Sequence, residues 1–91
     1  MVNLPQYQQS NMRLIKEIPN DFCKTTVYSF NNKFIIKLES GNYEQTFKVS
    51  ELDVSSVDEI EEMLGDTFFK RAMDRFQMMH EDFESIIDMV D

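Results

Sequence analysis

The first half of the chain alternates apolar and polar residues in the manner of β-strands. We predict four strands, at about residues 12–18, 22–30, 33–40 and 43–49. The pairs Asn31-Asn32 and Gly41-Asn42 separate the last three strands, and residues of these types tolerate the positive φ angles of tight hairpin turns. The pattern therefore predicts an antiparallel meander of three to four strands.

The two hairpin turns determine which side chains share a face of the sheet. A two-residue turn at 31–32 pairs Val27 with Ile36, and one at 41–42 pairs Ile36 with Phe47. These registers agree, and they predict a core face made of Val27, Phe34, Ile36, Leu38, Phe47 and Val49. The opposite face then carries Lys24, Tyr28, Phe30, Lys33, Ile35, Lys37 and Lys48.

The second half of the chain changes to the period of α-helices. Ser55 and Ser56 each precede an acid in capping-box spacing, so we predict a short helix at about 56–64, which Gly65 ends. A long amphipathic helix follows at about 67–90. Its apolar residues recur in alternating steps of three and four, at Phe69, Ala72, Phe76, Met79, Phe83, Ile86 and Val90.

The long helix exceeds the sheet on which it is expected to pack. Residues 66–90 span about 37 Å as a helix, whereas a strand of eight residues spans about 27 Å. The chain is therefore predicted to be an α+β domain over residues 11–91, with a loose arm at 1–10. The long helix packs on one sheet face, and its end overhangs.

Charge is divided between the two halves of the chain. The net charge is −8; residues 1–50 hold six Lys or Arg and four acids, and residues 51–91 hold three and thirteen. The acidic half disfavours duplex DNA and anionic membranes. No transmembrane run or signal-peptide pattern is present, and the single cysteine agrees with a reducing compartment. We expect a cytoplasmic protein.

The chain shows no pattern that a known chemistry requires. His80 is the one histidine, and with Glu84 it offers two ligands where a zinc site needs three or four. Cys23 has no histidine near it in sequence, which favours an inert thiol on the core side. Gly41 and Gly65 are isolated, so phosphate loops are excluded. We expect no enzyme activity, metal or cofactor.

Two surfaces could instead bind a partner. The leading hypothesis is a homodimer, or docking of a protein partner, through the end of the long helix, at Met79, Phe83, Ile86, Ile87 and Val90. The alternative is single-stranded nucleic acid on the face with Lys24, Tyr28, Phe30, Lys33, Lys37 and Lys48. Aromatic rings can stack with bases there, and lysines can neutralise phosphates.

The order of four strands followed by a helix, over about residues 12–90, resembles the purine-rich-element-binding repeat. That repeat is a dimerising module for single-stranded nucleic acid. The resemblance concerns the order of elements, and the break at Gly65 departs from it. It implies no role for any individual residue of this chain.

Overall fold

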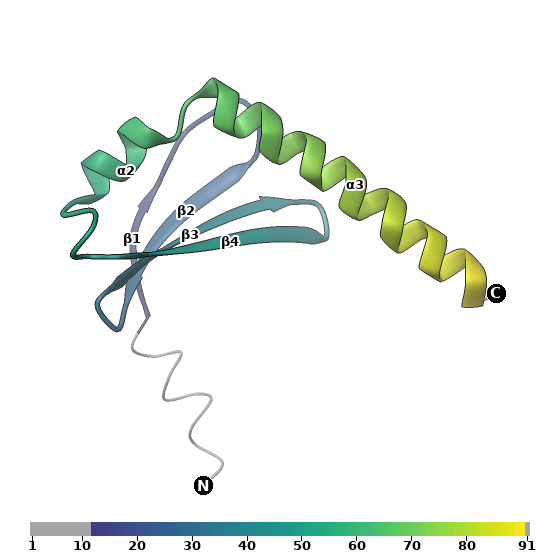
Figure 1. Ribbon diagram of the computed structural model, residues 1–91, viewed down its shortest axis with the longest axis horizontal. Helices are drawn as coiled ribbons and strands as arrows, with labels where there is room; N and C mark the ends of the chain where they lie inside the picture. The colour runs from purple at the N-terminus through teal and green to yellow at the C-terminus, as the bar shows by residue number, and fades with distance from the viewer. Residues whose placement is uncertain (1–11, 91) are drawn as a thin grey trace, which may run out of the picture.

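The computed structural model, which describes residues 12–90, has one antiparallel sheet followed by two helices (Figure 1). The strands lie in the order of the chain: β1 (Arg13–Glu17), β2 (Lys24–Phe30), β3 (Lys33–Ser40) and β4 (Tyr43–Ser50). The helices are α2 (Val57–Met63) and α3 (Asp66–Val90). The predicted α+β class is thus confirmed. The predicted arm at residues 1–10 lies outside the described residues.

The strand registers are those that the turn residues predict. Val27 pairs with Ile36, and Ile36 pairs with Phe47. Asn31 and Asn32 have φ angles of 57° and 64°, as a two-residue hairpin of this type requires. The core face and the lysine-bearing face are therefore assigned correctly across β2, β3 and β4.

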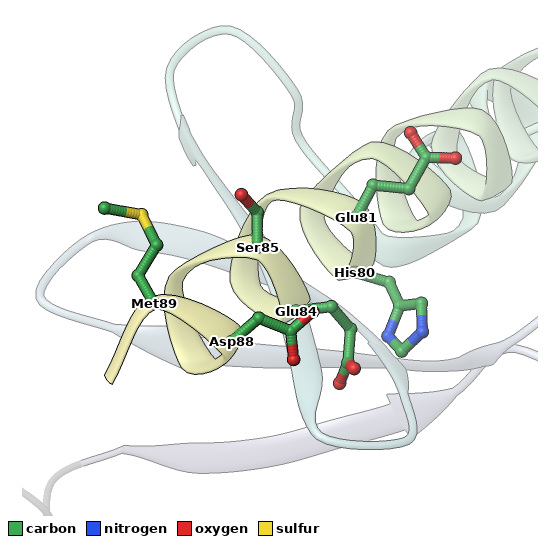
Figure 2. A pocket seen from close by; sticks show the side chains of 6 residues that line it. All are labelled: His80, Glu81, Glu84, Ser85, Asp88 and Met89. Carbon is green, nitrogen blue, oxygen red and sulfur yellow. The ribbon is translucent and has the colours of Figure 1, made fainter. Parts of the chain in front are cut away.

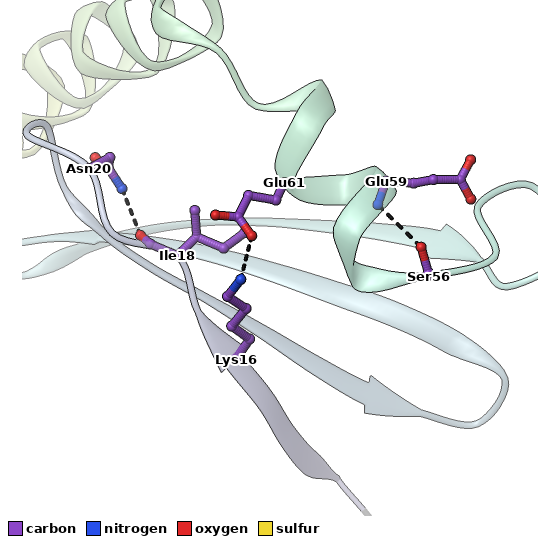
Figure 3. A network of polar contacts seen from close by, with 6 residues as sticks. All are labelled: Lys16, Ile18, Asn20, Ser56, Glu59 and Glu61. Carbon is purple, nitrogen blue, oxygen red and sulfur yellow. Dashed lines mark hydrogen bonds and ion pairs between the residues drawn. The ribbon is translucent and has the colours of Figure 1, made fainter.

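The start of β2 differs from the prediction, which placed a strand from residue 22. The side-chain Oδ1 of Asn20 accepts hydrogen bonds from the backbone N–H groups of Phe22, at 2.8 Å, and Cys23, at 3.0 Å. Its Nδ2 donates to the carbonyl oxygen of Ile18 at 3.0 Å (Figure 3). Asparagine side chains often organise turns in this way. Because of this turn, β2 begins at Lys24.

The core lies between the sheet and the two helices. Val27, Leu38 and Ile60 are fully buried, and complete burial of such side chains stabilises a fold by about 1.5–3 kcal/mol each. Helix α2 contributes Ile60, and α3 contributes its first apolar positions. Phe47 departs from the prediction, because it faces the core but is 37% exposed. It belongs to β4, which lies at the edge of the sheet.

Polar contacts fix the position of α2 between β1 and α3. Ser56 caps the helix by accepting a hydrogen bond from the N–H of Glu59 (Figure 3). The Glu59 carboxylate accepts from the hydroxyl and the N–H of Ser55, and these bonds lower its pKa. Lys16 of β1 donates to Glu61 of α2, which raises the pKa of Lys16. The contact between Lys16 and Glu61 thus joins α2 to the sheet.

Candidate interaction surface

The apolar stripe of α3 is covered along its first half and uncovered along its second. Phe69 and Phe76 are 3% and 4% exposed, because they pack into the core. Farther along the same stripe, Phe83, Ile86 and Val90 are 48%, 56% and 80% exposed. The sequence pattern is the same in both halves. The difference is that the sheet ends beneath the helix.

Strand β4 holds the first half of α3 in place. Gln45 donates from Nε2 to the carbonyl oxygen of Ala72 at 2.9 Å, and it accepts at Oε1 from Nε of Arg75 at 2.8 Å. The rings of Phe47 and Phe68 meet edge to face, with centroids 5.6 Å apart. These contacts align α3 with the edge strand and direct it towards the β3–β4 hairpin.

Tyr43 joins the tip of the hairpin to the second half of α3. Its Oη lies 3.0 Å from Nδ1 of His80, which is hydrogen-bond distance. Its ring meets the ring of Phe83 edge to face, with centroids 6.2 Å apart. Beyond these residues α3 extends past the hairpin (Figure 1). We call residues 80–90 the helix end, because every residue of this segment is exposed.

A groove lies where the helix end leaves the hairpin. The hairpin forms one wall, and α3 forms the other with both apolar and polar side chains. The groove is lined by Ser40, Gly41, Asn42, Tyr43, Met73, Phe76, Gln77, His80, Phe83, Glu84 and Ile87. It is continuous with the uncovered stripe, because Phe83 belongs to both and Ile87 lies beside the stripe. Groove and stripe together form one continuous surface.

The outward side of the helix end is polar and has no opposite wall. Figure 2 shows the side chains of His80, Glu81, Glu84, Ser85, Asp88 and Met89, all of which project from α3. Over residues 12–90, no group of three or more His, Cys, Asp or Glu residues is placed to hold a metal ion. His80 is instead engaged by Tyr43.

The helix end carries negative charge on both sides of its stripe. Residues 80–90 include Glu81, Asp82, Glu84 and Asp88, and they include no Lys or Arg. At 100° per residue, Asp82 and Glu84 flank the stripe, whereas Glu81 and Asp88 point farther away from it. Glu84 also lines the groove. The helix end therefore presents an apolar stripe with acidic margins.

The lysine-bearing face of the sheet leaves less aromatic surface open than the stacking of bases requires. Lys37 Nζ lies 5.4 Å from the centroid of the Tyr28 ring and 3.9 Å from a carboxylate oxygen of Glu44. Tyr28 and Phe30 are half-buried, and Ile35 is buried. Lys24, Lys33 and Lys48 are exposed on this face. The six predicted residues do share one face, but the ammonium group of Lys37 lies over the ring of Tyr28.

The structure places the five predicted partner-binding residues on one side of α3. Met79 is half-buried against the core, and the other four are exposed. Tyr43, Asn42 and His80 line the groove but were not predicted to belong to the site, because their position beside one another depends on where α3 crosses the hairpin. Cys23 falls within the predicted strand at 22–30, but it lies in the turn before β2. Its side chain is half-buried, with Sγ 3.7 Å from Oγ1 of Thr25.

Neither α2 nor α3 combines the length and the apolar character of a membrane-crossing helix, as judged over the described residues. No protein-family model, curated protein or solved structure matches the chain.

Proposed function

We propose that this chain is a small, non-enzymatic interaction domain that self-associates through the end of α3. The observation that carries the proposal is the apolar stripe, which continues through Phe83, Ile86 and Val90 after the sheet has ended. A solvated helix end needs no such stripe. Charged and polar residues on all sides would keep the helix soluble at lower cost.

The size of the uncovered stripe supports a binding role. Phe83, Ile86, Ile87 and Val90 are each 40% or more exposed. At roughly 100 Å² each, they leave about 400 Å² of apolar surface in one patch, which reaches the range of functional patches on monomers. Covering that patch is worth about 10 kcal/mol at 25 cal/mol per Å², before the entropic costs of association are subtracted.

Stability gives a second reason for a partner. A domain of 91 residues buries a modest fraction of its surface, and association is a common means of adding to it. The helix end makes few contacts with its own chain, so its last turns fray unless another surface supports them. The single cysteine agrees with a reducing compartment, and on that ground the proposal places the protein in the cytoplasm.

Nucleic-acid binding on the lysine-bearing face is the less favoured function. The contacts of Lys37 with Tyr28 and Glu44 reduce both the open ring surface and the free charge. A base would have to displace that lysine before it could stack on the ring. Exposed Lys24, Lys33 and Lys48 would remain for phosphates, and binding through them would weaken steeply as salt is raised.

The proposal predicts the mass of the protein in solution. Light scattering on the wild-type chain should give a mass that rises with protein concentration towards twice the 10.8 kDa of one chain. The rise reflects mass action on a weak to moderate interface. A mass of one chain at all concentrations up to the millimolar range would rule out self-association.

A further inference from the structure

We infer that the groove beside the β3–β4 hairpin is filled by the end of α3 from a second copy of the chain, in a reciprocal antiparallel dimer. This inference rests on the proposed self-association and names its geometry. Each copy contributes one helix end and one groove. The same residues therefore bind and are bound, as a two-fold axis requires.

The orientation of the stripe leads to this arrangement. Phe69 and Phe76 face the sheet, and Phe83 and Val90 lie on the same side of α3. The uncovered stripe therefore lies on the sheet side of α3. Because α3 extends past the hairpin tip (Figure 1), this part of the stripe faces the space just beyond that tip. A second copy rotated by a half turn places its own helix end in that space, with stripe against stripe.

The position of the groove selects the antiparallel direction. The groove lies where the helix end begins, between Asn42 of the hairpin and His80 of α3. In an antiparallel pair, the last turn of one helix reaches the beginning of the other helix end, and so meets the hairpin. In a parallel pair, both last turns would lie away from both hairpins, and the two grooves would stay open.

Interface area favours a contact that uses both features. The helix end is about 16 Å long, and the exposed apolar side chains of its stripe supply about 400 Å². A stable dimer buries about 800 Å² on each partner. Pairing of the stripes alone falls short of that value. The contact therefore has to extend onto the hairpin wall, where Asn42 and Tyr43 line the groove.

Charge makes the expected dimer sensitive to salt in a definite direction. Two helix ends bring eight carboxylates together, four from each copy, and no Lys or Arg lies between residues 80 and 90. Only Asp82 and Glu84 flank the seam, so repulsion weakens the pair without preventing it. Salt screens this repulsion. The dimer should therefore strengthen as ionic strength rises.

Engineered cysteines test the geometry. Cys23 is first replaced by Ser, and the variants Asn42→Cys and Val90→Cys are then made separately and given tags of different size. Both positions are exposed, so neither change should affect folding. After the two variants are mixed and oxidised, a disulfide should join different chains at least tenfold more than either variant joins to itself. Two Cα atoms must lie within about 7 Å to be bridged.

The other outcomes separate the inference from the proposed function. A disulfide in Val90→Cys alone would indicate a parallel pair, and it would overturn the antiparallel geometry while self-association stands. A dimer mass without any disulfide in the mixture would also overturn the antiparallel geometry and leave self-association in place. A mass of one chain at every concentration would overturn both the geometry and self-association. Between about 0.05 M and about 0.5 M salt, the dimer fraction should rise; a fall would point to the lysine-bearing face as the contact.

Discussion

The triple variant Phe83→Gln, Ile86→Gln and Val90→Gln is expected to be a folded monomer. The three side chains are 48%, 56% and 80% exposed in one chain, so their replacement removes little from its core. In the proposed dimer they would form the centre of the contact, where truncation of a buried apolar residue commonly costs about 1–2 kcal/mol. Together they should weaken the dimer at least about 100-fold.

Sedimentation velocity on the triple variant measures this loss, and circular dichroism checks that the chain stays folded. The matched control is Met78→Gln. Met78 is 62% exposed on the opposite side of α3, so its replacement also removes an exposed apolar group. The control should dimerise like wild type. A triple variant that still dimerises would show that the helix end is not the contact.

Phe69→Ala should produce the largest loss of stability of any change considered. The ring is 3% exposed, and it stacks on Phe22 with centroids 5.7 Å apart and planes 6° apart. The edge of Phe68 lies against it, with centroids 5.8 Å apart. Removing a buried Phe commonly costs about 3–5 kcal/mol, through lost burial and the cavity left behind. Domains of this size have about 5–15 kcal/mol in total.

Urea unfolding at a concentration where the chain is monomeric measures that change in the free energy of unfolding. Ile86→Ala, at a later position of the same stripe, is the matched comparison. Its side chain is 56% exposed, so in the monomer its loss should be below about 1 kcal/mol. Equal losses at the two positions would contradict the division of α3 into covered and uncovered halves.

Local chemistry made much of the fold predictable. The Asn31-Asn32 and Gly41-Asn42 pairs set two hairpin registers that had to agree, and the observed pairs match both. Two serines preceding acids predicted the start of α2, and Ser56 is the residue that caps it. In each case, the signal and the structure that it specifies lie within a few residues of each other.

Other features were not predictable from the pattern of apolar and polar residues. An apolar run suggested that β2 begins at Phe22, but the Asn20 side chain accepts hydrogen bonds from the N–H groups of Phe22 and Cys23 and holds these residues in a turn. Phe47 is partly exposed because β4 has no further strand beside it. Neither fact follows from alternation of apolar and polar residues.

The candidate site also has one part that was predictable from the sequence and one part that was not. The stripe on α3 follows from the helical period, so all five candidate partner-binding residues were predicted to lie on one side of the helix. The groove needs Tyr43 beside His80, and this contact joins residues 37 positions apart in the chain. It depends on how α3 crosses the hairpin, which the contacts of Gln45 with Ala72 and Arg75 determine.

Hydrogen exchange at two protein concentrations would locate the surface that a second copy is proposed to cover. Amides of residues 80–90 should exchange faster than those of residues 69–79 when the chain is dilute, because the helix end is unsupported. At high concentration, protection should rise in residues 80–90 and at the hairpin tip around Asn42. Exchange in these two segments that does not change with concentration would contradict the account.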